Sequence, residues 1–574
     1  MNLFEIYLKD IKKAVLKNQN QIDLKSIKDL DSVIVESPPL KFDFDLSSNI
    51  ALVLAKKNNA NPRDIAEKVK KILLKELKDF STIEVAGPGF LNFKFEGKNW
   101  MKIINNISKS KKKFGSSNKK KKYNIEFVSA NPTGPLHIGH CRGAVFGDVL
   151  SNLLKFNGNK VTKEYYINDY GNQIKNFAES VFFRLREIKF KENFPEKKEL
   201  YPGHYIINIA NKILKTYPKI NLTNFDKIKN KLINDSLKHS MLLIKSDLKK
   251  LGIKHDYFFS EKKIVTKNLV DKTVKKLKKD RFVEEGFLDP PKGEEQTEWK
   301  KTKRLIFKSS LFGDDSDRAL KKDDGSWTYF ANDVAYHADK VSRKYDYLIN
   351  ILGADHTGYI KRISAAVNAL SKNQVILICK VCQLVKLFKN GQPYKMSKRK
   401  GEFISVNELL KEVGKDSVRF MMLNRGNDVE LDFDFNRVLE KSKDNPVFYV
   451  QYSYARINSL FRLLKINLSK KINLDSSKFS PNFFEYQLLR KIIEWPRIIE
   501  VASNKFEPHR VTFYLYELAT IFHSYWTKGN EDPKFKFIQN GKINNLLSFK
   551  IFQLTSAVLE NGMTILGVSL PKKM

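Results

Sequence analysis

The stretch EFVSANPTGPLHIGH, residues 126–140, decides the fold of the central part of this chain. Residues 123–129 are predicted to form a buried strand, and the prolines and glycine that follow predict a loop. A helix is predicted from about 137 to 157, because it carries an apolar stripe and Gly158 follows as a stop signal. A second strand is predicted at 161–167. A strand–loop–helix–strand unit of this kind is typical of a doubly wound parallel sheet.

Two histidines begin the predicted helix. In such a sheet, the loop brings the start of the helix to the carboxyl edge of the strands, where nucleotides bind. A helix N-terminus favours phosphate. His137 and His140 are three residues apart and can face one ligand, while Gly139 permits close approach of an adenine ring or a backbone. The alternative is that the two histidines lie at the start of a helix and bind no ligand.

A second motif, KMSKR, lies at residues 395–399 between Gly391 and Gly401. A cationic loop of this kind can stabilise the charge that develops on departing pyrophosphate. The alternative is a surface run of charge, which is common in so basic a chain. Lys+Arg number 104 and Asp+Glu number 64, a net charge of +40. That charge predicts a polyanionic partner. The composition of the chain is also biased toward Lys, Asn and Ile, and this bias accounts for part of the excess positive charge.

Acidic residues stand out against this charge. Glu126 lies on the first predicted strand, and Tyr329 and Asp333 are four residues apart on a predicted helix. A carboxylate beside an aromatic ring suits a guanidinium group, which prefers planar acceptors and ring stacking. An ordinary amphipathic helix with a salt bridge would have the same pattern.

The length of 574 residues predicts three to four domains. We expect a first unit at 1–106 with strands at 81–85 and 90–95, followed by a basic linker at 107–122. The alternative for this basic stretch is a contact with phosphate. The α/β domain is expected at 123–440, with an inserted segment at about 180–325. After about Asn445 only amphipathic helices are expected, which predicts a helical bundle at 441–574.

Neither a membrane-spanning segment nor a signal peptide is predicted. Three cysteines in the whole chain exclude a disulfide scaffold and fit a reducing cytoplasm. Cys379 and Cys382 form a CxxC pair with no second pair nearby. A single buried strand over 375–387 is predicted there in preference to a zinc or redox site.

In their order and spacing, the histidine and lysine motifs are similar to the two signature motifs of class I aminoacyl-tRNA synthetases. Residues 126–173 resemble the arginyl-tRNA synthetases of the bacterial type, as do five further segments: 87–92, 312–318, 324–330, 353–359 and 444–452. The stretch His523–Trp526 resembles the same family. The matches span nearly the whole chain.

The resemblance implies a Rossmann-type catalytic domain with an insertion, a small α+β N-terminal domain that contacts the tRNA elbow, and an all-α bundle that binds the anticodon. It implies a cytoplasmic, monomeric enzyme that joins L-arginine to tRNA(Arg) through arginyl-adenylate, with ATP as substrate and Mg²⁺ accompanying it. No protein ligand for a metal is assigned.

The resemblance also implies residue roles. The arginine site would contain Glu126, Ser129, Asn131, His140, Tyr329, Asp333 and His356. The ATP site would contain Gly134, His137, Gly139, His140, Asp355, Lys395, Met396, Ser397, Lys398 and Arg399. Of these, His137, His140, Lys395 and Lys398 would act in catalysis. Tyr449, Tyr452 and Trp526 would stack on tRNA bases.

Two features depart from the family pattern. The segment 42–49 lacks an expected glycine, and the lysine motif is complete where many relatives lack its second lysine, which predicts a direct role for Lys398. Two other functions remain open at this point: a class I synthetase for another amino acid, and an inactive RNA-binding relative. The resemblance also implies that adenylate formation needs bound tRNA.

Overall fold

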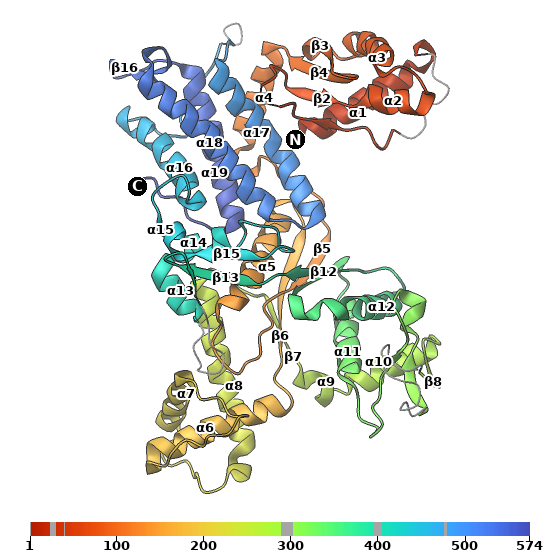
Figure 1. The fold of residues 1–574 in the computed structure, drawn as a ribbon, viewed down its shortest axis with the longest axis vertical. Helices are drawn as coiled ribbons and strands as arrows, with labels where there is room; N and C mark the ends of the chain where they lie inside the picture. Colours follow the sequence, from red (N-terminus) through yellow and green to blue (C-terminus); the bar gives the residue numbers. More distant parts are fainter. Residues whose placement is uncertain (1, 23–29, 40, 289–301, 395–403, 476–478) are drawn as a thin grey trace. The chain divides into compact units, whose positions relative to one another are not determined.

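A computed structural model describes residues 2–22, 30–39, 41–288, 302–394, 404–475 and 479–574. The chain divides into two compact units (Figure 1). Unit 1 combines residues 1–118 with 440–574, and unit 2 contains residues 119–439. Within the described ranges, no helix combines the length and apolar character needed to cross a membrane.

Unit 2 is built on a five-stranded sheet in the order β12-β11-β5-β6-β7, and every neighbouring pair is parallel. Its strands are β5 (Lys122–Glu126), β6 (Lys160–Ile167), β7 (Tyr257–Ser260), β11 (Tyr347–Gly353) and β12 (Ile376–Cys382). The chain starts at the central strand β5, builds toward β7, and then returns to the other side of β5 with β11. The strand order therefore reverses between β5 and β11, and ligands bind at such a switch point.

The structure confirms the predicted strand–loop–helix–strand unit. Helix α5 (Ile138–Phe156) follows β5 and leads to β6. A side chain at Gly147 would place its Cβ 2.3 Å from the ring of Phe127, so the helix packs close to the end of the first strand. Asp148 on α5 is buried and accepts hydrogen bonds from Lys163 on β6 at 2.6 Å and from Arg419 at 2.6 Å.

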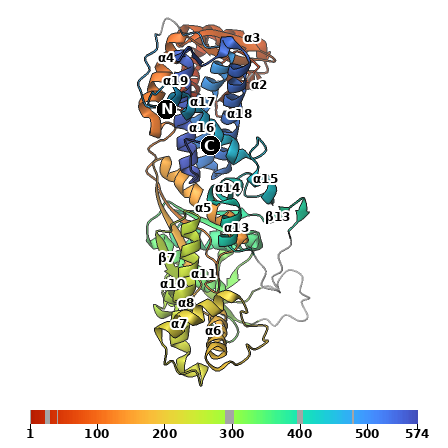
Figure 2. The same ribbon diagram turned by 90° about the vertical axis from the view of Figure 1, so that its left-hand side faces the viewer.

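Helices and short sheets surround the five strands. A helical lobe, yellow in Figure 2, has its own apolar core and consists of α6 (Asn172–Phe190), α7 (His204–Thr216) and α8 (Phe225–Lys250). The second apolar cluster packs around α11. The helices beyond the lobe are α9 (Lys262–Thr266), α10 (Leu269–Lys279), α11 (Tyr329–Ser342), α12 (Ile360–Ser371), α13 (Val406–Val413), α14 (Lys415–Met421) and α15 (Phe435–Leu439).

The remaining strands of unit 2 form two small sheets. One has the order β10-β9-β8 and the other β14-β13-β15. They are β8 (Val283–Gly286), β9 (Arg304–Phe307), β10 (Arg318–Ala319), β13 (Val385–Lys389), β14 (Gln392–Pro393) and β15 (Leu431–Asp434), with 3₁₀ turns η3 (Ser309–Phe312) and η4 (Ala354–Tyr359).

The segment around the two cysteines differs from its prediction. Residues 375–387 contain two strands, β12 and β13, which belong to different sheets. Only Gln383 and Leu384 lie between them, and neither is a glycine or a proline, so the pattern alone does not show the break. Strand β7 also lies within the expected insertion at 180–325, because that segment returns to pair with β6.

The N-terminal part of unit 1 is an α+β layer with a four-stranded antiparallel sheet in the order β1-β2-β4-β3. The strands predicted at 81–85 and 90–95 are confirmed. The elements are α1 (Leu3–Lys17), η1 (Gln19–Gln21), β1 (Val35–Glu36), β2 (Leu46–Ser48), α2 (Ile50–Asn58), α3 (Pro62–Glu76), β3 (Phe80–Ala86), β4 (Phe90–Phe95), α4 (Gly97–Ser110) and η2 (Lys111–Lys113).

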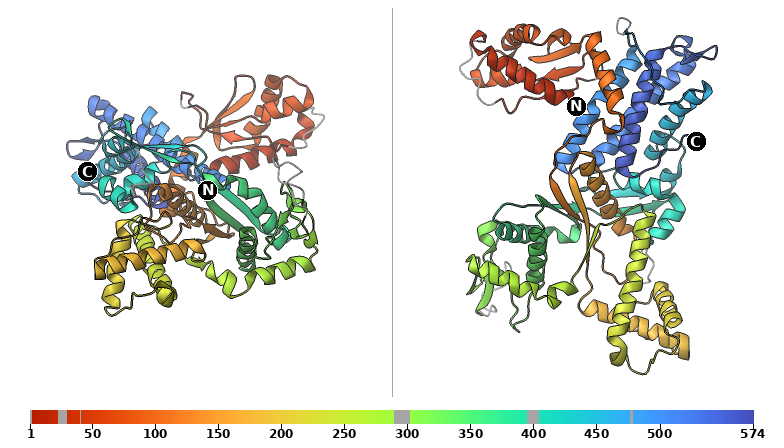
Figure 3. Two further views of the ribbon diagram at one scale, coloured as in Figure 1. Left: turned by 60° about the horizontal axis from the view of Figure 1, so that its bottom comes forward. Right: turned by 180° about the vertical axis from the view of Figure 1, so that it is seen from behind.

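The C-terminal part of unit 1 is the predicted helical bundle (Figure 3). Its helices are α16 (Pro446–Leu463), α17 (Phe483–Lys505), α18 (His509–Glu531) and α19 (Leu546–Leu566), with the turn η7 (Pro533–Phe535). The expectation of helices alone was wrong in one detail. Strands β16 (Ile538–Gln539) and β17 (Lys542–Ile543) form a short hairpin between α18 and α19.

Candidate active site

The site lies where β5 and β11 end side by side. Glu126, the last residue of β5, pairs in register with Asn350 on β11. The start of α5 follows β5 through a short loop, so a helix N-terminus and two strand ends meet at the switch point. This is the geometry that binds nucleotides in parallel sheets.

The two histidines cap helix α5. His137 is the N-cap, and its Nδ1 accepts a hydrogen bond from the Gly139 backbone N–H at 3.1 Å. Nδ1 of His140 accepts from the His137 backbone N–H at 3.2 Å. Because each Nδ1 is an acceptor, a neutral ring carries its proton on Nε2. Burial, together with the neighbouring His137, lowers the pKa of His140 to about 3.

Gly139 allows the two rings to pack closely. The centroids of the His137 and His140 rings are 3.9 Å apart. A Cβ at position 139 would lie 2.9 Å from Cε1 of His137, so a side chain there would displace that ring. Gly139, which was predicted to leave space for a ligand, thus also leaves space for the ring of His137.

Glu126 is held by groups of unit 2. Its Oε2 accepts hydrogen bonds from the Tyr336 hydroxyl at 2.8 Å and from the ammonium of Lys340, and its Oε1 accepts from Ser129 Oγ at 3.1 Å. Lys340 is fully buried and also donates to Asn350 Oδ1 at 2.9 Å. Burial opposes the charged carboxylate, but the cation of Lys340 outweighs it and lowers the pKa of Glu126.

A second group of carboxylates lies beside Glu126. Burial is the main cause that raises the pKa of Asp333 to about 6, and Glu126 raises it further. Asp333 Oδ2 accepts a hydrogen bond from the Tyr359 hydroxyl at 2.6 Å. Burial, followed by the charges of Asp333 and Asp169, raises the pKa of Glu261 to about 7. We refer to Asp333, Glu261 and Asp169 as the acidic cluster.

The acidic cluster has an excess of negative charge. Among the described residues, Oε2 of Glu261 is buried without a hydrogen-bond partner. Asp169 is held in place by Ser260 Oγ at 2.6 Å and by the Lys262 backbone N–H at 2.9 Å, and neither group supplies a charge. Like charges kept together in a low dielectric favour an incoming cation.

The backbone after β5 is strained. Val128 and Ser129 have φ angles of 71° and 38°, in the left-handed region that branched side chains rarely adopt. Such conformations cost about 1–3 kcal/mol each and cluster at functional sites. Here the strained turn lets Ser129 Oγ reach Glu126 while it accepts the Tyr166 backbone N–H at 3.0 Å.

The other predicted arginine-site residues lie nearby but do not all converge. Asn131 donates to Gln173 Oε1 at 2.9 Å and accepts from Asn168 Nδ2 at 3.1 Å, so it belongs to a polar group at the start of α6. Tyr329 begins α11, one turn before Asp333, and is 80% exposed. The ammonium of Lys322 lies over its ring, 5.7 Å from the ring centroid.

The predicted ATP contacts are partly outside the described residues. A side chain at Gly134 would place its Cβ 3.1 Å from the Tyr205 ring. Asp355 and His356 are both exposed on η4, with 3.6 Å between Oδ2 and Nε2, and His356 lies close enough to lower the pKa of Asp333. The segment Lys395–Arg399 lies outside the described residues.

Residues 404–406, which follow this motif, lie beside the start of α5 and its histidines. The Ile138 backbone N–H donates to the Ile404 carbonyl at 3.1 Å, and the Val406 N–H donates to the Leu136 carbonyl at 3.0 Å. His137 and Ser405 form an antiparallel bridge. The residues that follow the lysine motif are therefore fastened to the start of α5.

Three family models match the chain. They are described as arginyl tRNA synthetase N terminal domain (residues 7–95), tRNA synthetases class I (R), catalytic domain (residues 103–461), and DALR anticodon binding domain (residues 450–574). A protein named Arginine–tRNA ligase from Pelagibacter ubique is 51% identical over 577 residues, covering all of both chains. The chain belongs to the arginyl-tRNA synthetase family.

Further relatives agree with this assignment. An Arginine–tRNA ligase from Bartonella bacilliformis is 43% identical over 589 residues and is matched over its whole length. The arginyl-tRNA synthetase structure from Thermus thermophilus shares the fold, with a TM-score of 0.73, 19% identity and full coverage of both chains. As a member of the family, the chain is a class I synthetase and an arginine–tRNA ligase. The two other functions that the sequence left open are thereby excluded.

In the arginyl-tRNA synthetase bundle of unit 1, the aromatic residues predicted to meet tRNA gather around one cation. The guanidinium carbon of Arg456 lies 4.2 Å from the Tyr452 ring centroid and 5.1 Å from that of Trp526. Its Nη1 contacts His523 Nδ1 at 3.0 Å, and the Tyr449 ring lies 4.2 Å from His523. Burial lowers the pKa of His523 to about 4, so that ring is neutral.

The sequence did not indicate several residues of these sites. Glu261 and Asp169 come from separate segments, and no spacing rule connects them with Asp333. Lys340 was one of many lysines, although its position seven residues after Asp333 places it two helical turns further along α11. Arg456 follows Tyr452 by four residues, and this i, i+4 spacing was a usable signal.

Proposed function

We propose that this synthetase binds the guanidinium of L-arginine at the acidic cluster, with Asp333 as its main partner. The observation that carries this assignment is a set of carboxyl groups held together away from water. Burial and then the charge of Glu126 raise the pKa of Asp333, and burial and then the charges of Asp333 and Asp169 raise the pKa of Glu261. A guanidinium supplies the missing positive charge and several donors in one plane. Glu126 supports the site through Lys340 and Ser129, and the exposed Tyr329 ring stacks on the substrate.

The reaction has two steps. The arginine carboxylate attacks the α-phosphorus of ATP to form arginyl-adenylate and pyrophosphate, and the terminal ribose of tRNA then attacks the mixed anhydride and releases AMP. No covalent enzyme intermediate is needed, so the chain supplies position and charge. His137 and His140 present Nε2–H donors to the phosphates at the N-terminus of α5. Gly134, Gly139 and Asp355 complete the nucleotide site, and Asn131 and His356 assist arginine.

Lys395 and Lys398, with Met396, Ser397 and Arg399, act on the β- and γ-phosphates. Arg399, the last residue of the motif, precedes Ile404 by five residues in the sequence. Ile404 is itself bonded to the start of α5. This tether supports a joint site for the two motifs.

Mg²⁺ would enter with ATP rather than occupy a protein site. Within the described residues, no group of three His, Cys, Asp or Glu side chains could hold a metal ion. We write the nucleotide substrate as the Mg²⁺ complex of ATP. No catalytic step is derived from the metal.

For tRNA(Arg), we propose that Tyr449, Tyr452 and Trp526 receive anticodon bases, with Arg456 fixed between two of the rings. Base stacking on aromatic rings and on guanidinium planes is the usual way that single-stranded loops are bound. The limits 1–106, 107–122, 123–440 and 441–574 remain our domain assignment, with the first domain at the tRNA elbow. We propose that the enzyme acts as a monomer in the cytoplasm.

The direct test is aminoacylation of total tRNA with each of the twenty amino acids, in the presence of ATP and Mg²⁺. Charging with arginine alone is expected. Charging with a different amino acid would overturn the role of the acidic cluster.

The affinity for arginine is expected to fall as the pH is lowered from 8 to about 5.5. The pKa values of Asp333 and Glu261 in the free protein are raised to about 6 and about 7, so both take up protons in this range and lose the charge that attracts the guanidinium. The two sites interact, so one broad transition is expected. KM for arginine in pyrophosphate exchange, measured with tRNA present, reports the change. A KM for arginine that stays constant from pH 8 to 5.5 would contradict the assignment.

Replacement of Lys398 by alanine is expected to reduce kcat of adenylate formation about 100-fold or more, the usual cost of losing one group that stabilises transition-state charge. KM for arginine should change little. The matched control is Lys411→Ala, which removes an exposed lysine of α13. An unchanged kcat in Lys398→Ala would end the proposal that this lysine acts directly.

Replacement of Arg456 by alanine is expected to raise KM for tRNA about 10- to 100-fold, because a stacked base contributes about 1–3 kcal/mol. KM for arginine and for ATP should stay the same. Arg510→Ala is the control, since Arg510 is paired with Glu507 at the start of α18. Equal effects of the two variants on tRNA would indicate a general loss of charge.

A further inference from the structure

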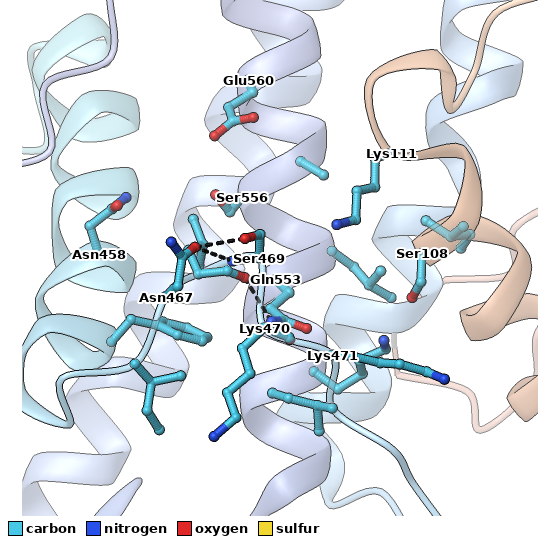
Figure 4. A pocket seen from close by; sticks show the side chains of 18 of the residues that line it. Ser108, Lys111, Asn458, Asn467, Ser469, Lys470, Lys471, Gln553, Ser556 and Glu560 are labelled. Atoms are coloured by element: carbon cyan, nitrogen blue, oxygen red, sulfur yellow. Dashed lines mark hydrogen bonds between the residues drawn. The ribbon is translucent and has the colours of Figure 1, made fainter.

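A pocket of about 1500 Å³ lies within unit 1, between α4, α16 and α19 and the chain that follows α16 (Figure 4). Tyr454 and Asn458 line it from α16. Tyr452 precedes Tyr454 by two residues, and Arg456 precedes Asn458 by two residues. Two residues correspond to a rotation of about 200° around the helix. The pocket therefore opens on the face of α16 opposite the proposed anticodon site.

One face of α19 forms a wall of this pocket. Lys550, Gln553, Ser556 and Glu560 line the pocket and repeat at three- and four-residue spacing, which places them on one face of the helix. Figure 4 shows the last three of them. Nε2 of Gln553 donates to the carbonyls of Leu468 at 2.7 Å and Lys470 at 2.8 Å. These bonds hold the chain after α16 against the helix, so the pocket is built rather than a gap between loops.

The lining is strongly cationic. Eight lysines and one arginine contribute to it, against one carboxylate, Glu560, which accepts a hydrogen bond from the Tyr454 hydroxyl at 2.7 Å. In the part of the chain that the structure describes, none of these nine cations forms an ion pair with a carboxylate. The positive charge of the pocket is thus not balanced by the protein itself.

Lys550 is the unusual member of this set. It is 6% exposed, and it is the one charged residue among the buried side chains of α19. Burial, followed by the charges of Lys111 and Lys471, lowers its pKa. Taking an ammonium out of water beside two further cations is unfavourable unless an anion balances it.

We propose that this pocket binds a ligand that carries two or more linked phosphate groups. Several ammonium groups that line one volume suit an anion with several charges better than a single carboxylate. The volume exceeds what one phosphate needs. Two sources share this chemistry: a free oligophosphate or nucleotide, and the backbone of bound RNA. The position on the face of α16 away from the aromatic residues favours the free ligand.

The experiment measures binding of inorganic tripolyphosphate to the full chain by calorimetry, with a non-hydrolysable arginyl-adenylate analogue in the reaction site. Lys550→Gln removes the buried charge. A second variant, Lys112→Gln with Lys471→Gln, removes two exposed lysines of the pocket and avoids any change in the core. The matched control, Lys68→Gln with Lys71→Gln, removes two exposed lysines of α3 in the same unit.

Affinity for tripolyphosphate is expected to fall at least tenfold in both pocket variants and to stay within twofold in the control. Competition by tRNA separates the two sources: displacement of tripolyphosphate by tRNA assigns the site to RNA phosphates, and independent binding assigns it to a free ligand. Unchanged affinity in both pocket variants would overturn the proposal, as would an equal loss in the control.

Discussion

Asp333→Asn is expected to lower kcat/KM for arginine about 100- to 1000-fold, equivalent to about 3–4 kcal/mol. Asparagine keeps the shape and can still accept the hydrogen bond from Tyr359, which is 2.6 Å from Asp333. It removes the negative charge that we assign to the guanidinium. The other buried carboxyl of the cluster, Glu261, has a pKa raised to about 7 and is only partly ionised near neutral pH, so it replaces that charge only in part.

The measurement is pyrophosphate exchange with tRNA present, at varied arginine and at varied ATP. KM for ATP should stay the same, because the nucleotide is assigned to the start of α5. Asp271→Asn, at an exposed position in the first turn of α10, is the control for the change in charge. A wild-type kcat/KM for arginine in Asp333→Asn would remove the acidic cluster from the arginine site.

Lys340→Met is expected to lower the free energy of unfolding of unit 2 by about 3–5 kcal/mol, the usual cost of breaking a buried ion pair from one side. Lys340 is fully buried, and its ammonium neutralises Glu126 and donates to Asn350. Without it, the Glu126 carboxylate is left charged in a low dielectric. Methionine keeps most of the volume, so the effect comes from the charge and not from a cavity.

Urea unfolding followed by a probe in unit 2 measures this loss. The double variant Lys340→Met with Glu126→Gln is expected to recover most of it, because the unpaired charge is then gone. Lys272→Met, on the exposed side of α10, is the control and should leave the midpoint in place. An unchanged midpoint in Lys340→Met would show that Glu126 finds another partner.

The local elements were predictable because short-range rules govern them. The apolar stripe and the stop at Gly158 are enough to define α5, and the turn at residues 87–89 separates β3 from β4. The prediction of a single strand at 375–387 was wrong because short-range rules alone were available there. No glycine or proline marks the connection at residues 383–384, and the sheet that each half joins depends on its pairing with β11 or β15.

The sequence by itself determined the family, the parallel-sheet fold and the positions of the histidine and lysine motifs, because these depend on residue order over short distances. Only the tertiary structure determined which charged side chains lie close together. Glu126 and Lys340 are separated by 214 residues, and Glu261 comes from a segment between them. Electrostatic energy depends on distance in space and on burial, and neither quantity is written in the order of the residues.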